Sequence, residues 1–257
     1  MTRLASLEIS AVRGFKHIER GDDLAGLIAA AFQESGHALR TGDVVVVAQK
    51  IVSKAEGRLV DLATVSPSPR AVAIGEEIGK DPRLVEVILS ESVRVVRKRP
   101  GLLIVEHRLG FVMANAGVDQ SNIAAPDGKE RVLLLPENPD GSAASLRARL
   151  LALTGAALGV VINDSFGRAW RRGTVGIALG VAGLPALIDL RGRADLFGRR
   201  LEVSIVGFAD EIAAAASLLM GQADEGRPVV LLRGLEWSAP ASSAATLVRP
   251  PEEDLFR

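Results

Sequence analysis

The sequence predicts a mixed α/β protein of the α+β type, and three observations support that prediction. Apolar runs typical of strands, such as the four valines at 44–47, are interspersed with amphipathic stretches of helical length. They follow no strict strand–helix–strand repeat. Hydrophobic residues make up 48% of the 257 residues, which is enough for a large core. Because neither an internal repeat nor a clear linker divides the chain, we expect residues 1–257 to form a single module.

The first half of the chain contains both element types. Asp22 and Asp23 stand in the first turn of one expected helix, where carboxylates suit the helix dipole. Pro82 occupies an early helical position at which proline is tolerated. The expected elements are strands at 4–12, 44–47, 92–99 and 101–117 and helices at 21–35, 69–79 and 81–92.

The second half continues the mixture. Pro139, Asp140 and Ser142 precede a basic amphipathic helix, and Gly221 ends another. The segment 238–257 is rich in Pro, Ser and Ala, and we expect it to wrap around the surface or a partner. The expected elements are helices within 135–155 and at 210–220 and strands at 157–162, 200–209 and 227–235.

Composition excludes several classes of function. A formal net charge of zero argues against a nucleic-acid binder that depends on a basic surface. The absence of cysteine excludes disulfides and thiolate sites, and three histidines make a histidine-rich zinc site improbable. The start of the chain lacks the apolar core of a signal peptide. The apolar run at 175–188 is too short for a bilayer and is interrupted by glycines and a proline, so we expect a cytoplasmic protein without a membrane partner.

Nucleotide-binding motifs of the common kinds are missing. The chain has no P-loop sequence, and the spacing of Gly176, Gly180 and Gly183 does not match a dinucleotide fingerprint. These glycines are expected to permit close packing instead. The packed neighbour lies either within the protomer or across a two-fold axis.

Two aspartates follow apolar strands. In "VVINDSFGRAWRRG" (160–173), Asp164 is placed at a strand end and precedes Arg168. In "NAGVDQSN" (115–122), Asp119 follows another strand. Solvated turns explain both patterns, and in the first the polar residues would cap a helix. Alternatively, two carboxylates and the Ser165 hydroxyl hold a magnesium or manganese ion while arginine meets phosphate. The residues alone leave both interpretations open.

Two weaker candidates accompany these acids. Lys54 follows a buried strand and could neutralise phosphate as a point charge, although a solvated lysine is the commoner case. The loop 220–228 follows a helix end, where free carbonyl groups can meet a cation or a ribose. A flexible loop that begins at a terminating glycine explains the same pattern.

Taken in order, these segments resemble the coenzyme F420:L-glutamate ligase family, specifically its γ-glutamyl ligase domain. The last residues, "LVRPPEEDLF", are similar to the point where longer actinobacterial members continue into a nitroreductase-like domain. That second activity is not expected here. The similar segments are "GDDL", "GDVVVVAQKIVSKAEGR", "NAGVDQSN", "LLLPENPDGSAASLR", "VVINDSFGRAWRRG", "LFGRRLEVS", "ADEIAAAASLLMG" and "VVLLRGL".

The resemblance implies a GTP-dependent ligase. Its members join the amine of L-glutamate to a carboxylate of the deazaflavin coenzyme precursor through an acyl phosphate, and further γ-linked glutamates can follow. Magnesium or manganese and a response to potassium are implied. The resemblance also implies a family-specific two-lobed fold and an intertwined homodimer. No nucleic-acid or membrane partner is expected.

The resemblance also assigns roles to individual residues. The chain has Phe15 and Lys16 where the family usually reads Leu-Pro, and the missing proline changes a segment implied to contact the nucleotide. Ser165 replaces the usual threonine and keeps its hydroxyl. The implied metal ligands are Asp119, Asp164 and Ser165; the nucleotide-contacting residues are Phe15, Lys16, His17, Ile18, Gln49, Lys54, Asn122, Met220, Gly221 and Gln222; the catalytic residues are Asp164, Arg168 and Lys54.

Two other functions remain open on the sequence. A glutamate ligase for another cofactor precursor, such as a pterin, is compatible with the altered segment 13–18. A GTP-binding partner protein without turnover is the second alternative. Asp119, Asp164 and the hydroxyl of Ser165 argue against it, because simple binding does not need an intact metal centre.

Overall fold

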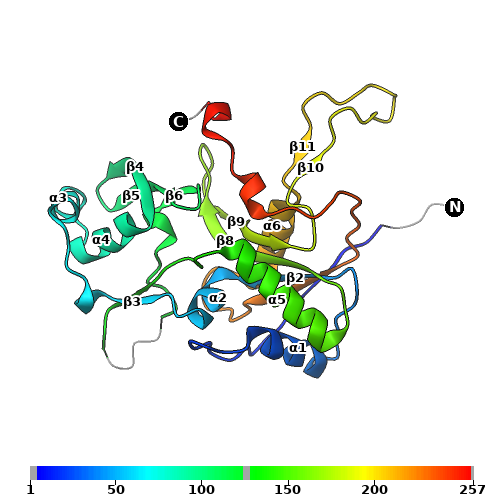
Figure 1. The fold of residues 1–257 in the computed structure, drawn as a ribbon, viewed down its shortest axis with the longest axis horizontal. Coiled ribbons are helices and arrows are strands. Elements are labelled where there is room, and N and C mark those ends of the chain that lie inside the picture. Colours follow the sequence, from blue (N-terminus) through cyan, green and yellow to red (C-terminus); the bar gives the residue numbers. More distant parts are fainter. Residues whose placement is uncertain (1–4, 124–127, 256–257) are drawn as a thin grey trace.

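The structure is a computed structural model that describes residues 5–123 and 128–255. It confirms the mixed α+β class. We call residues 59–123 and 128–133 the small lobe, and the other described residues the large lobe (Figure 1). The main elements of the large lobe are β1 (Glu8–Ala11), α1 (Leu24–Glu34), β2 (Val44–Ala48), α2 (Gln49–Ala55), α5 (Pro139–Thr154), β8 (Gly159–Gly167), β9 (Thr174–Ala182), β10 (Ile188–Asp189), β11 (Ile205–Val206), α6 (Phe208–Met220) and β12 (Val229–Arg233).

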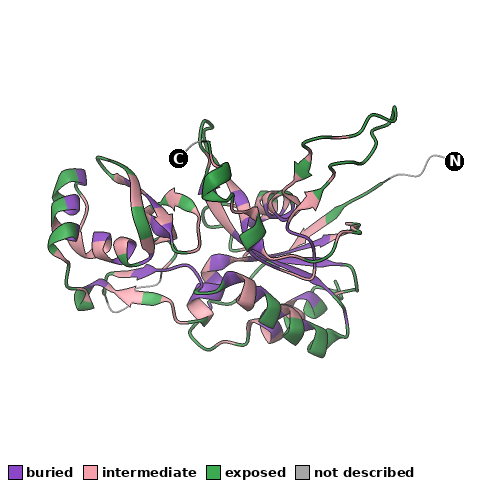
Figure 2. Cartoon of the chain, turned by 45° about the horizontal axis from the view of Figure 1, so that its top comes forward, coloured by how far each residue is buried: buried purple, intermediate pink, exposed green. Residues whose placement is uncertain are grey.

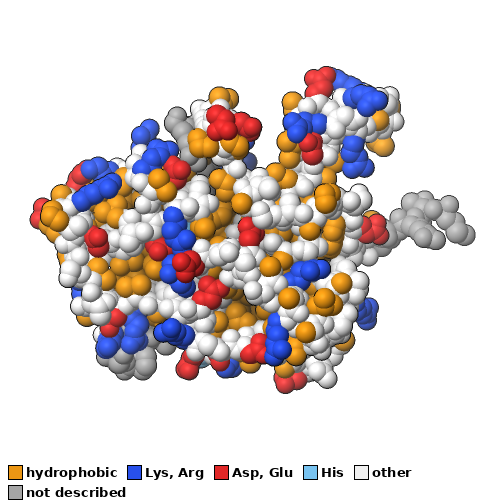
Figure 3. Space-filling model, viewed as in Figure 1, with side chains coloured by type: hydrophobic (Ala, Val, Ile, Leu, Met, Phe, Trp, Pro, Cys, Tyr) orange, Lys and Arg blue, Asp and Glu red, His pale blue; other side chains and the backbone are white. Residues whose placement is uncertain are grey.

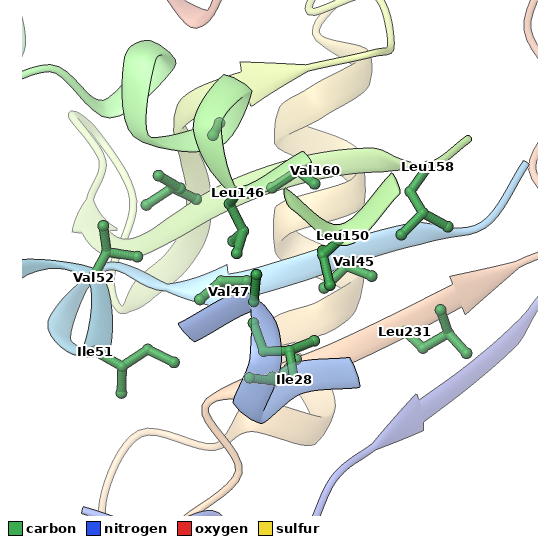
Figure 4. Packing of buried hydrophobic residues seen from close by; sticks show 14 of the residues in the cluster. Ile28, Val45, Val47, Ile51, Val52, Leu146, Leu150, Leu158, Val160 and Leu231 are labelled. Atoms are coloured by element: carbon green, nitrogen blue, oxygen red, sulfur yellow. The ribbon is translucent and has the colours of Figure 1, made fainter. Parts of the chain in front are cut away.

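A five-stranded sheet in the order β1-β12-β2-β8-β9 forms the centre of the large lobe. Its β2–β8 pair is parallel and the other pairs are antiparallel. The four valines of β2 are fully buried because helices cover both faces of the sheet. Val45 and Val47 pack with Ile28 of α1 and Leu150 of α5 (Figure 4). The alternate side chains of β2 pack under α6.

The glycines of β9 allow helices to approach closely within the protomer. A Cβ atom on Gly176 would lie 2.1 Å from Ser217 Oγ of α6, and one on Gly180 would lie 2.2 Å from the carbonyl oxygen of Pro139 in α5. Such distances are far inside van der Waals contact, so only glycine fits. The close-packing prediction is therefore confirmed, and the packed neighbour belongs to the same chain.

The small lobe packs two helices against a three-stranded sheet. Leu103 and Val105 of its central strand are fully buried in a cluster with Ile88 of a helix. Asp81 and Ser68 cap the two helices, and prolines occupy their first turns. The elements are β3 (Leu59–Asp61), α3 (Pro69–Ile78), α4 (Pro82–Ser90), β4 (Ser92–Arg99), β5 (Leu102–His107), β6 (Val112–Ala114), the 3₁₀ turn η2 (Asn115–Gly117) and β7 (Arg131–Leu133).

A cluster of charged side chains joins the two lobes. Arg58 Nη2 and Arg108 Nε lie 3.0 Å and 3.2 Å from Glu91 Oε2, and Nε2 of the buried His107 lies 3.5 Å from the same oxygen. Burial favours the neutral acid, but the contact with His107 and the two arginine charges outweigh it and lower the pKa of Glu91 to about 2. Arg58 also donates from Nε to the carbonyl group of Leu135, which leads into α5. This interlobe cluster therefore connects α4 of the small lobe to the large lobe.

The β10–β11 ribbon projects from the large lobe (Figure 1), and Figure 2 shows it almost entirely exposed beside the buried central strands. The strand prediction for 200–209 is wrong in extent, because only Ile205–Val206 is extended and paired. The alternating apolar residues of that segment have no protein layer to pack against. The strand expected at 4–12 shortens to Glu8–Ala11. None of the described helices is long and apolar enough to cross a membrane.

Candidate functional site

The short helix α2 carries the basic side of the candidate site. It begins directly after β2, and Lys50 and Lys54 share one face because they are four residues apart. Lys50 Nζ lies 2.6 Å from Asp119 Oδ2. Lys54 Nζ donates to the carbonyl oxygen of Asn122 at 2.8 Å. Burial, and secondly the charge of Lys50, lower the pKa of Lys54.

Asp119 is held by the loop that follows η2. Its backbone exchanges two hydrogen bonds with Leu133, at 3.0 Å and 2.8 Å. Ser121 donates to the carboxylate from its backbone N–H at 2.7 Å and from its hydroxyl at 3.1 Å. Burial raises the pKa of Asp119, but the hydrogen bonds from Lys50 and Ser121 outweigh burial and lower it.

Left-handed backbone is concentrated beside this carboxylate. Asn115, Ala116 and Asn122 have φ values of 52°, 54° and 56°. Asparagine adopts the left-handed conformation more readily than other residues, so the strain, about 1–3 kcal/mol, falls mainly on Ala116. The loop around Asp119 thus contains one strained residue, a feature that is enriched at functional sites.

Asp164 lies inside β8, three residues before its end, and not at a strand terminus as the sequence suggested. No helix follows it, so the helix-capping interpretation is wrong. The β2–β8 pairing ends at Asn163, and from Asp164 onward β8 pairs with β9 alone. Burial raises the pKa of Asp164 to about 7, and the negative charge of Asp119 adds to this, against opposing interactions with Ser165, Lys50 and Gln49.

Two contacts bring the loop after α6 to the same place. Asn122 donates from Nδ2 to the carbonyl oxygen of Ala223 at 3.3 Å. Asn163, next to Asp164, donates from Nδ2 to Ser217 Oγ at 3.2 Å and to Met220 Sδ at 3.3 Å. The structure therefore gathers most of the residues expected at a nucleotide and metal site, namely Gln49, Lys54, Asp119, Asn122, Asp164, Met220, Gly221 and Gln222.

Two expected residues stand apart from this group. Ser165 points to the opposite face of β8 from Asp164, because side chains alternate along a strand. Arg168 lies in the β8–β9 connection, and its Nη2 donates to the carbonyl group of Arg172 at 3.1 Å. Its Nε is buried and has no hydrogen-bond partner among the described residues. That free donor leaves Arg168 able to bind an anion, so its assigned role stays a prediction.

The segment 15–18 lies near the same helix from another side. Ile18 is buried in the large-lobe core, whereas Lys16 Nζ forms an ion pair with Asp22 at 2.8 Å. The backbone N–H of Gly21 donates to the carbonyl oxygen of Ala55 at 2.8 Å. This contact places Gly21, three residues after the segment, beside the end of α2 that carries Lys54. Within residues 5–123 and 128–255, no polar side-chain contact assigns a role to His17 or Phe15, so their nucleotide contacts stay a prediction.

The carboxylate pair fits a hard divalent cation. Within the described ranges no three His, Cys, Asp or Glu side chains form a metal cluster. Magnesium keeps several waters and needs only one or two carboxylates, so a pair is sufficient. Burial is the main cause of the raised pKa of Asp164, and the charge of Asp119 adds to it more than the opposing charge of Lys50 subtracts. Additional positive charge would be favourable there.

Sequence reasoning missed Lys50, which forms the ion pair with Asp119. Its position one helical turn before Lys54 was the available signal, because residues four apart share a helix face. Together, paired carboxylates, two lysines and the loop after α6 can bind a phosphate chain with its cation and protect it from water.

The sequence of this chain is similar to one protein family and to relatives that share a single name. A family model described as F420-0:Gamma-glutamyl ligase matches residues 14–234. A coenzyme F420:L-glutamate ligase of Methanothermobacter thermautotrophicus is 47% identical over 253 residues, covering 98% of this chain and 99% of its own. Equally named proteins of Methanopyrus kandleri and Archaeoglobus fulgidus are 47% and 45% identical, and these matches cover 100% and 98% of this chain.

Proposed function

Because the chain belongs to the F420-0:Gamma-glutamyl ligase family, we propose that it joins L-glutamate by an amide bond to a carboxylate of the coenzyme F420 precursor, at the expense of GTP. Further γ-linked glutamates can be added to the first. The observation that carries this proposal is the convergence of Asp119, Asp164 and Lys54 in a chain that matches named ligases over nearly its whole length.

The proposed reaction has two balanced steps. The terminal phosphoryl group of GTP passes to a carboxylate oxygen of the precursor, which gives an acyl phosphate and GDP. The amine of L-glutamate then attacks the acyl carbon, phosphate leaves and the nitrogen loses a proton. A free carboxylate resists attack by an amine, so the site must align the reactants and exclude water from the acyl phosphate.

The residues of α2 and its neighbouring loops serve the first step. Lys54 is half-buried, so its charge would act on phosphate oxygens in a medium of somewhat lower dielectric than water. Lys50 orients Asp119 through their 2.6 Å contact. Arg168, whose Nε has no hydrogen-bond partner among the described residues, would have to move toward the phosphate chain to donate to the transferring group.

Asp119 and Asp164 would hold the divalent cation, magnesium or manganese. Such a cation, when bound, neutralises phosphate charge and supports phosphoryl transfer. Gln49 stabilises the charged form of Asp164 through its side chain and so keeps the ligand available. Ser165, predicted as a third ligand, has its side chain on the opposite face of β8 from Asp164 and is not part of this proposed metal set. We also propose that the backbone of 220–222 contacts the nucleotide and that potassium enhances turnover.

The β10–β11 ribbon supports a homodimer as part of this proposal. Leu196 and Phe197 at its tip are 98% and 95% exposed, and Figure 3 shows hydrophobic side chains on the ribbon beside charged ones. An isolated two-stranded ribbon is marginally stable in water, and exposed apolar side chains favour burial against a second chain. Light scattering should give twice the 27.0 kDa chain mass, and Phe197→Asp should lower it. An active species at 27.0 kDa that persists at micromolar concentration would exclude an obligate dimer.

Mass spectrometry of the reaction products tests the proposed function. The purified protein is incubated with the deazaflavin precursor, L-glutamate, magnesium and either GTP or ATP. We expect the precursor to gain glutamyl residues with GTP and to react more slowly with ATP. Modification of a pterin precursor instead would establish the alternative acceptor. Binding of GTP without any product would show a nucleotide-binding protein and contradict the proposal.

A further inference from the structure

A small cavity lies close to the candidate site and has no role in the reaction proposed above. Its volume is about 240 Å³. Four segments line it: the β5–β6 turn, the β8–β9 pair, the start of α6 and the C-terminal segment, which is drawn in red near β9 in Figure 1. The lining residues used below are Phe111, Phe166, Ile177, Asp210, Val248 and Arg249.

Two residues that line the cavity lie on the same segments as the two carboxylates proposed to bind the metal. Phe166 and Asp164 lie on the same face of β8, two residues apart, which corresponds to about 7 Å along a strand. Phe111 immediately precedes β6, and β6 leads through η2 to Asp119. A ligand in the cavity would therefore have Asp164 within reach of a short side chain.

The chemistry of the lining suits a planar aromatic group. The rings of Phe111 and Phe166 meet edge to face with centroids 5.7 Å apart. Ile177 and Val248 add apolar walls. Asp210 is partly buried, accepts a hydrogen bond from Ala178 N–H at 2.9 Å, and can accept another from a ring N–H group. The exposed Arg249 adds a positive charge at the wall, and Asp254 adds a negative one.

We propose that this cavity is the acceptor subsite, in which the deazaflavin ring of the coenzyme precursor binds while its carboxylate reaches toward Asp164 and Asp119. This inference rests on the proposed function. Sites for whole drug-sized ligands measure about 300–1,000 Å³, so a smaller cavity fits the ring portion alone. The remainder of the precursor would then lie along β8 toward the phosphate chain.

The C-terminal segment forms a fixed wall of this subsite. The N–H group of Ala244 donates to Asp140 Oδ1 at 2.8 Å, and the same oxygen accepts from Val181 N–H of β9 at 2.8 Å. A Cβ atom on Gly110 would lie 3.0 Å from Val248, so this part of the segment packs directly on the β5–β6 turn. Residues 244–249 are thus expected to influence acceptor binding without contacting GTP.

A larger cavity of about 670 Å³ between α1, α2 and α5 is the competing location. Its α2 wall is formed by Val52, Ala55 and Glu56, on the side of the helix away from Lys50 and Lys54. An acceptor bound there would be separated from the phosphate site by α2. The charged residues that line it are Asp22, Asp23, Glu56, Glu137 and Arg149.

Steady-state kinetics with matched variants tests the inference. Ile177→Phe fills the proposed subsite, and Arg249→Ala removes an exposed charge with little risk to folding. We expect the first to raise the KM for the precursor at least tenfold and the second to raise it several-fold, with the KM values for GTP and L-glutamate unchanged. Ser145→Phe, in the larger cavity, is the matched control and should leave all three values unchanged.

A binding measurement separates this inference from the proposed function. The probe is the deazaflavin chromophore without its carboxylate-bearing side chain, followed by its fluorescence on addition of the metal-free protein. We expect binding that the full precursor displaces, that GTP does not displace, and that Ile177→Phe weakens. If the probe does not bind, or if Ser145→Phe and not Arg249→Ala raises the precursor KM, the subsite assignment is wrong. Absence of ligation by the wild-type protein would instead contradict the proposed function, because probe binding needs no turnover.

Discussion

Two buried carboxylate groups of this protein meet opposite electrostatic surroundings. Glu91 in the interlobe cluster faces Arg58, Arg108 and His107, and its pKa falls to about 2. Asp164 in the candidate site is buried beside Asp119, and its pKa rises to about 7. In the first group, buried charge is compensated within the protein and connects the two lobes, whereas the Asp119–Asp164 pair is where we propose that a cation binds.

Removing the compensated carboxylate should have the largest effect on stability. Glu91→Ala leaves Arg58 and Arg108 close together without their shared partner. Breaking one partner of a buried ion pair typically costs about 3–5 kcal/mol. Urea unfolding measures this loss, with Glu77→Ala as the control, since Glu77 pairs with Lys98 at the surface. A surface pair is worth less than about 1 kcal/mol. Equal losses in the two variants would show that the interlobe cluster does not stabilise the fold.

Removing the uncompensated carboxylate should affect turnover and spare the fold. Asp164→Asn keeps the size of the side chain but loses the charge that would hold the cation. Loss of one such electrostatic group costs about 3 kcal/mol, or at least a hundredfold in rate. Product formation with GTP and magnesium measures this, with the exposed Glu34→Gln as control. Near-normal turnover in Asp164→Asn would contradict the metal assignment.

The two groups should also give stability opposite pH dependences. The pKa of Glu91 is lowered on folding, so its contribution is present above about 4.5, the ordinary value, and is lost as the pH falls toward 2. The pKa of Asp164 is raised, so its contribution is present below about 3.8 and is lost as the pH rises through 7. Urea unfolding of the metal-free protein between pH 4 and 8 should show stability falling in the wild type more than in Asp164→Asn. Parallel pH profiles for the two proteins would remove Asp164 as the cause.

Local sequence patterns anticipated the elements that build the large lobe. The valine run became β2 because an apolar strand covered on both faces is recognisable from its residues alone. The helix expected at 210–220 was found as α6 (Phe208–Met220) and does end before Gly221. The strand prediction for 200–209 was too long. Alternating apolar and polar residues stabilise a strand only where another layer of the protein packs on its apolar face.

The candidate site was only partly readable from the sequence. Asp119 and Asp164 could be selected as acids near apolar strands, and the family resemblance added Gln49 and Asn122. Their convergence depends on α2 meeting a loop of the small lobe, a contact between residues about seventy positions apart such as Lys54 and Asn122. The interlobe cluster gave no signal at all, since its members are spread over three separate segments and become a group only after folding.

Thermal unfolding with and without magnesium at pH 8 tests the central claim most directly. At this pH the metal-free wild type holds Asp164 and Asp119 both charged, and a bound cation should raise its unfolding temperature. Magnesium at a hundred times its dissociation constant stabilises a single site by about 2.7 kcal/mol. The account predicts that metal-free Asp164→Asn unfolds at a higher temperature than the metal-free wild type and gains little from magnesium. A variant that is less stable than the wild type without metal, yet gains as much from magnesium, would contradict the account.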